Sequence, residues 1–205
     1  MEDKKMNEKE SLELIAQMIR NTRRNLDTGS GNMFLLWGYA SALITLVIWG
    51  GLYFTRNPVW MWGFWGIPAV GYPLVSFLQH KRQKGIQSYA DKVLGDAWKY
   101  LGAVCMVFVI SASFTNAYEM ILPFTAILLS VGSIFTGAVI RCTSFFILPG
   151  FGIVLGMNMF FDVWERTASF YLLLEFALVI IFAMIIPGHI LNYKAKKELG
   201  EPVEE

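Results

Sequence analysis

Long apolar blocks, separated by short polar segments, make up the chain after residue 32. Each block is about 20 residues long, which is the length of α-helix that crosses a hydrocarbon core of about 30 Å. This pattern predicts an all-α protein, a polytopic bundle of transmembrane helices. Six spans are expected, at about residues 33–54, 59–79, 98–116, 120–140, 144–163 and 168–191.

The first 32 residues are polar and charged, and they predict an amphipathic helix over about residues 8–26. Its apolar side chains recur at spacings of three, four and seven residues, on one helix face: Leu12, Ile15, Ile19 and Leu26. Because an isolated helix of this length is marginally stable in water, we expect it to lie on the membrane surface or against the segment 80–97. A Gly/Ser linker at 29–31 is expected to end the helix before the first span.

Lysine and arginine residues set the expected orientation, because cytoplasmic loops carry an excess of them. Six spans place both termini on one side, together with fifteen of the seventeen Lys and Arg residues. Only Arg56 and Arg166 fall on the other side. The expected organisation is an N-terminal cytoplasmic helix and linker at 1–32, a transmembrane domain at 33–193 and a cytoplasmic tail at 194–205.

Composition agrees with a membrane protein and narrows the possible partners. Hydrophobic residues are 55% of the chain and charged residues 16%, with a mean hydropathy of +0.48. Soluble domains are nearer a quarter charged. The formal net charge is +1, so no overall field selects nucleic acid. The expected partner is the lipid bilayer, and the basic cluster at 80–84 is either an ordinary anchor of a span or a site for anionic lipid headgroups.

Motifs of familiar catalytic and cofactor sites are missing from the sequence. It contains no H-E-x-x-H metal motif, no G-x-x-x-x-G-K-[ST] phosphate loop and no G-x-S-x-G nucleophile elbow. The two histidines, His80 and His189, end different spans, and Cys105 and Cys142 are too few for a disulfide framework. We therefore expect no catalytic residue, no cofactor and no metal site, and we do not expect an enzyme.

Glu175 is the one acidic residue in the apolar run YLLLEFALVI, residues 171–180. It is expected about seven residues into the last span, or about 10 Å deep. A carboxylate facing lipid at that depth is costly, so the side chain is expected to face other helices. There it either forms a structural hydrogen bond or serves a proton-coupled or cation-binding role; the remaining alternative is a surface acid whose side chain extends outward to the membrane interface. A regular helix would place it on one face with other polar or aromatic side chains, and the candidate intramembrane polar site comprises Glu175, Asn158, Tyr171 and His189.

Proline and glycine interrupt two of the expected spans at similar places. Residues 67–71 resemble residues 148–152, and the two spans run in opposite directions. This similarity is either a chance match or the trace of an inverted repeat, and many transporters bind their substrate at helices interrupted in this way. The expected helix-break positions are Pro68, Gly71, Pro73, Pro149, Gly150 and Gly152.

Four segments together resemble a family of uncharacterised bacterial inner-membrane proteins of about this length. They are LIAQMIRNTRRNL, GNMFLLWGYAS, NPVW and IPAVGYPL, and the resemblance extends over most of the chain. It implies a location in the bacterial inner membrane and a role in a regulated membrane response. No catalytic or binding residue can be transferred from it.

Two functions therefore stand ahead of a membrane enzyme. The first is a membrane-embedded partner or sensor protein, whose N-terminal helix contacts another protein and which could form a homo-oligomer. The alternative is a small-solute or proton-coupled transporter or channel with a site between the second, fifth and sixth spans. A polar cavity reaching Glu175 would favour transport, and a packed bundle with a projecting N-terminal helix would favour the partner role.

Overall fold

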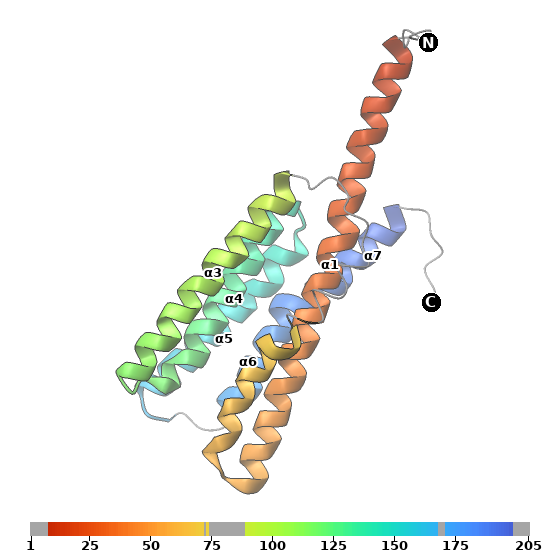
Figure 1. The fold of residues 1–205 in the computed structure, drawn as a ribbon. Helices are drawn as coiled ribbons and strands as arrows, with labels where there is room; N and C mark the ends of the chain where they lie inside the picture. The colour runs from red at the N-terminus through yellow and green to blue at the C-terminus, as the bar shows by residue number, and fades with distance from the viewer. Residues whose placement is uncertain (1–7, 72, 74–88, 168–170, 199–205) are drawn as a thin grey trace.

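The structure, a computed structural model, describes residues 8–71, 73, 89–167 and 171–198 (Figure 1). Throughout these ranges the regular elements are helices, and none is a strand. Five helical stretches are long and apolar enough to cross a membrane, namely Gly31–Thr55, Lys92–Phe114, Tyr118–Ile140, Ser144–Trp164 and Leu172–Lys194. The prediction of an all-α bundle with several membrane-length helices is confirmed.

The elements follow the predicted spans closely where both are described. In chain order they are α1 (Glu8–Thr55), the 3₁₀ helix η1 (Pro58–Trp65), α3 (Tyr89–Phe114), the 3₁₀ turn η2 (Tyr118–Met120), α4 (Ile121–Ile140), α5 (Ser144–Trp164), α6 (Leu172–Ile180), the π-helix η3 (Ile181–Ile185) and α7 (Ile186–Glu198). Most of residues 72–88 lies outside the described part of the chain, and the basic cluster at 80–84 falls there.

The described part of the second expected span runs back along α1. Its backbone is a 3₁₀ helix over Pro58–Trp65 and then helical through 71, so the helix type changes near 66 and the chain does not break at Pro68. Glycines on this segment contact α1 in antiparallel order. A Cβ on Gly63 would lie 2.9 Å from Ile48, and one on Gly71 would overlap the indole of Trp37.

α1 is one continuous helix of 48 residues, and the linker expected at 29–31 is helical instead (Figure 1). A glycine inside a helix costs only about 1 kcal/mol, which packing can offset. Gly31 has such packing, because a Cβ there would overlap the Asn192 side chain of α7. The N-terminal part of α1 therefore continues in line with the span and projects beyond the bundle, and it does not fold back beside the start of α3.

The last span changes helix type in its middle. α6 ends at Ile180, a five-residue π-helix follows, and α7 begins one residue before Pro187. Proline lacks an N–H and its ring collides with the carbonyl four residues earlier in an α-helix. In the wider π turn Ile186 donates to the carbonyl of Ile181, five residues back. The regular helix expected over 168–191 is therefore wrong at this point, and Pro187 is the physical reason.

α5 stays α-helical through its proline and glycines, so the breaks expected at Pro149, Gly150 and Gly152 do not occur. Pro149 is buried, and membrane helices tolerate proline when neighbouring helices and side chains surround the freed backbone groups. The glycine serves close packing instead: a Cβ on Gly152 would lie 2.5 Å from Ser130 Oγ on α4. This agrees with the role of small residues at helix interfaces in lipid.

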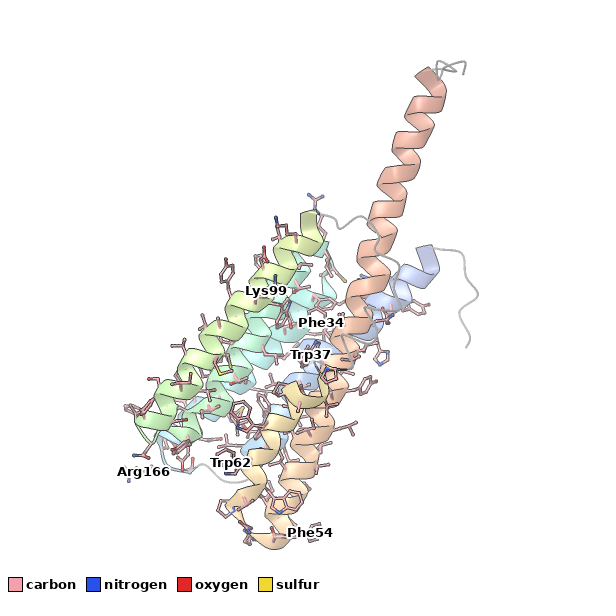
Figure 2. All side chains as sticks on the ribbon, in the orientation of Figure 1. Phe34, Trp37, Phe54, Trp62, Lys99 and Arg166 are labelled. Carbon is pink, nitrogen blue, oxygen red and sulfur yellow. The ribbon has the colours of Figure 1, made fainter. Side chains whose placement is uncertain are left out.

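Two apolar clusters fill the bundle. The larger joins α1, α4, α5 and α6 through Ala42, Ile48, Leu122, Ala126, Met159, Val163, Leu172, Leu173, Phe176, Val179 and Ile180. The smaller cluster contains Phe34, Cys142, Phe145, Ala183, Met184 and Leu191. Phe34 of α1 meets Phe145 edge-to-face at 4.9 Å and Trp98 at 5.5 Å, so it links the first span to α5 and α3 (Figure 2).

Candidate functional site

The structure separates the four residues that were expected to form one intramembrane polar site. Glu175 and His189 are 14 residues apart in the last span, which corresponds to roughly 20 Å along the helix. The π-helix between them also shifts the downstream residues around the helix axis, so the predicted common face is lost. Asn158 lies near Glu175, whereas His189 lies beside α1. Tyr171 is exposed at the start of α6.

Glu175, Asn158 and Asp162 form a polar cluster where α5 ends and α6 begins. The Asn158 amide donates to Asp162 Oδ2 at 3.4 Å and also hydrogen-bonds the Glu175 side chain. Glu175 lies in the first turn of α6, which is shallower than the depth expected from the sequence. Its partly buried side chain keeps one oxygen, Oε2, buried without a hydrogen-bond partner among the described residues.

This polar cluster has two chemical uses. The Asn158 amide ties α5 to α6 through its hydrogen bond with Glu175, which is a structural role. The second use of the cluster would be proton transfer, since it contains two carboxyl groups and ionisable groups in membrane helices often mark proton pathways. An acidic residue in the first turn of a helix is further stabilised by the helix dipole. The cluster is therefore the part of the bundle on which the transport alternative depends.

A second polar site joins α1 to α7 near the end from which α1 projects. Asn192 Nδ2 donates to Asn32 Oδ1 at 2.7 Å, and the Tyr39 hydroxyl and His189 Nε2 are hydrogen-bonded at 2.6 Å. The Tyr39 and His189 rings also meet edge-to-face, with centroids 5.8 Å apart. Of these four residues only His189 was expected in a site, and its partner is 150 residues away in the chain.

Glycines make this contact between α1 and α7 possible. A Cβ on Gly188 would lie 3.1 Å from the Leu35 side chain and 3.4 Å from the Gly31 carbonyl oxygen. One on Gly38 would lie 2.9 Å from Ile185 Cγ1, within the π-helix. Gly31, Gly38 and the buried Thr45 are each seven residues apart, so they form one stripe on α1. We call the contact of this stripe with η3 and α7 the α1–α7 joint.

A surface depression lies at the turn between α4 and α5. It is lined by Gly137, Ala138, Arg141, Cys142, Thr143 and Phe146. Arg141 ends α4 in the left-handed conformation at φ 55°, and Lys194 Nζ lies 3.9 Å from the buried Cys142 Sγ. None of its lining residues belongs to the Glu175 cluster, so this depression is not an entrance to that cluster.

Comparisons with protein-family models, with curated proteins and with solved structures find no match for this chain. Its function is therefore argued from the two polar sites and from the arrangement of the helices.

Proposed function

We propose that this protein is a bacterial inner-membrane protein that acts as a membrane-embedded partner or sensor, and that the projecting part of α1 contacts another component. The observation that carries this proposal is the continuity of α1 from Glu8 to Thr55. Binding at the projecting end can move the bundle directly, because the helix is continuous and no linker separates its projecting part from the span. It arrives first at the α1–α7 joint, where two hydrogen bonds connect the helices.

The proposed topology has six spans with both ends of the chain in the cytoplasm. Its support is that α1 begins and α7 ends toward the same end of the bundle (Figure 1), and that the segment 58–71 runs back along α1. The two labelled basic residues lie at the ends predicted for them: Lys99 lies nearer the end from which α1 projects, and Arg166, one of the two basic residues predicted outside, lies at the opposite end (Figure 2).

The alternative function is a proton-coupled or cation-coupled transporter. It is favoured by one observation, the Glu175 carboxyl oxygen that is buried beside Asn158 and Asp162 without a hydrogen-bond partner in the described part of the chain. Ionisable residues inside membrane helices often mark ion or proton pathways. Against it, α5 is unbroken at the proline and glycines where a transporter of this kind would unwind.

A pair of variants at Ser30 tests the partner role. Ser30→Pro interrupts α1 at the base of its projecting part, whereas Ser30→Ala keeps the helix intact. Each variant and the wild type are expressed in bacterial membranes and treated with an amine-reactive crosslinker. We expect specific adducts with the wild type and Ser30→Ala, and their loss with Ser30→Pro at equal membrane abundance. Adducts that persist unchanged in Ser30→Pro would contradict the proposal.

Proteoliposomes containing a trapped pH-sensitive dye test the alternative. The wild type is expected to pass no more protons than empty liposomes under an imposed potential. A proton flux that depends on Glu175, lost in Glu175→Gln, would favour transport over the partner role.

A further inference from the structure

The π-helix η3 determines which face α7 turns toward α1. Compared with an α-helix, a π turn holds about one extra residue, and one residue corresponds to about 100° of rotation about the helix axis. Every residue after η3 is therefore rotated by about that amount relative to a regular continuation of α6. His189 and Asn192, which bond to α1, both lie after η3.

A regular helix through the same residues would undo the α1–α7 joint. Without the extra residue, Gly188 would take the place that His189 occupies, and Leu191 would take the place of Asn192. Neither replacement can hydrogen-bond Tyr39 or Asn32 with its side chain. The two bonds at 2.6 and 2.7 Å therefore exist only in the π form.

Two features favour the π form locally. In a regular α-helix the Pro187 ring would press against the carbonyl of Ala183, which disfavours the α form, and the wider π turn before Pro187 avoids this contact. Gly38 on α1 provides the space for that turn, since a Cβ there would lie 3.2 Å from Met184 Cβ and closer still to Ile185. The α form would instead gain the better hydrogen-bond geometry of an ordinary helix. Two opposing local effects therefore set the free-energy difference between the forms: the proline contact disfavours the α form, and the poorer hydrogen-bond geometry disfavours the π form.

We propose that η3 is a conformational switch. In the π form it locks α7 to α1, and in the α form it rotates α7 by about 100° and releases the projecting part of α1 from the joint. This inference rests on the proposed partner role, because it names the element through which a contact at the projecting end would change the bundle. The movement needs no ligand inside the membrane. It breaks the α1–α7 joint and turns Leu191 away from the smaller apolar cluster.

Thiol crosslinking in the full-length protein tests the switch. Tyr39→Cys and His189→Cys are combined in a background with Cys105→Ala and Cys142→Ala, and a short bifunctional thiol reagent is applied to membranes. We expect efficient crosslinking between positions 39 and 189. Adding Pro187→Ala should reduce it at least fivefold, because removal of the proline ring shifts the equilibrium from the π form to the α form. Pro149→Ala, at a buried proline in the regular helix α5, is the matched control and should leave the yield unchanged.

A deletion provides the rescue. Removing Phe182 from the Pro187→Ala variant removes the extra residue, so a regular helix again places position 189 opposite position 39, and crosslinking should return. Removing Leu174 instead should not restore crosslinking, because the buried residues of α6 that follow it keep their places and only the few residues before it shift. Crosslinking that stays within twofold of the starting level in Pro187→Ala, or that fails to return after deletion of Phe182, overturns the proposal. If Pro187→Ala alone does not accumulate in membranes, the variant that combines Pro187→Ala with deletion of Phe182 still tests the proposal, because it should crosslink efficiently.

These crosslinks involve no other protein, so their outcome is independent of the adducts that test the partner role. Adducts that persist in Ser30→Pro together with intact switching would refute only the partner role. Adducts that are lost in Ser30→Pro, with no switching in the thiol crosslinks, would refute only the inference about η3.

Discussion

Replacing Gly31 by alanine should destabilise the protein through one contact, the approach of α7 to α1. A Cβ at this position would overlap the Asn192 side chain and lie 3.2 Å from the Gly188 carbonyl oxygen. Overpacking of this kind costs about 1–3 kcal/mol. The Asn192 amide is the movable part, but moving it stretches its 2.7 Å bond to Asn32. A hydrogen bond between membrane helices is worth about 0.6 kcal/mol on average and about 1.7 at most.

A double-mutant cycle separates these two costs. Asn192→Ala alone should cost about 0.6–1.7 kcal/mol, the value of the interhelical bond. In the Asn192→Ala background the overlap at Gly31→Ala largely disappears, so the double variant should cost clearly less than the sum of the single variants. The measurement is the free energy of unfolding in mixed micelles, followed by tryptophan fluorescence.

Gly50→Ala on the same helix is the control for helix propensity. Nothing lies within 4 Å of a Cβ at Gly50, so this change should be neutral or should stabilise α1 by up to about 1 kcal/mol. Equal free energies for Gly31→Ala and Gly50→Ala, or strictly additive costs in the cycle with Asn192→Ala, would refute the close approach of α7 to α1.

Three further predictions concern other parts of the bundle, and each is measured as the same free energy of unfolding. Glu175→Gln should be nearly neutral, because glutamine can keep the hydrogen bond with Asn158, whereas Glu175→Leu should cost about 0.6 kcal/mol by removing that bond between helices, since Asn158 still bonds to Asp162. Gly132→Ala should be destabilising by about 1–3 kcal/mol, since its Cβ would lie 2.8 Å from Leu101, while Gly102→Ala has open space and should not be. Trp98→Phe should cost about 1 kcal/mol through loss of the 3.2 Å bond to Thr136, and an unchanged stability would show that this bond contributes nothing.

The span positions could be predicted because lipid imposes a simple rule on the chain. Apolar length decides where a helix crosses, and the predicted 120–140 and 144–163 agree with α4 and α5 within one residue at each end. The turn between them also follows, since Arg141 and Thr143 are the polar interruption and Arg141 takes the left-handed conformation that ends α4.

The continuity of α1 could not be predicted from residues 29–31 alone. Two glycines around a serine favour a break by local propensity, and only the distant helix α7 explains why the helix continues. The partners Asn192 and Gly188 are more than 150 residues away in the chain, and no spacing rule connects them with Gly31. Tertiary packing overrides the local preference here.

The candidate polar site was only partly predictable for a related reason. Asn158 and Glu175 could both be singled out, because polar side chains in apolar runs are conspicuous, and their interaction is found in the structure. Grouping them with His189 required a regular helix from Tyr171 onward. Pro187 was the available signal against that assumption, because an interior proline commonly distorts the turn before it.

The length of α1 has a consequence for where a partner protein can be met. About 23 residues of the helix precede the span that begins at Gly31, which corresponds to roughly 35 Å at 1.5 Å per residue. Charge on lipid headgroups is screened within about 8 Å at physiological ionic strength. In the proposed topology, with α1 along the membrane normal, its first residues would stand several screening lengths from the bilayer surface. A partner at that end would then be bound beyond the reach of the headgroup charge.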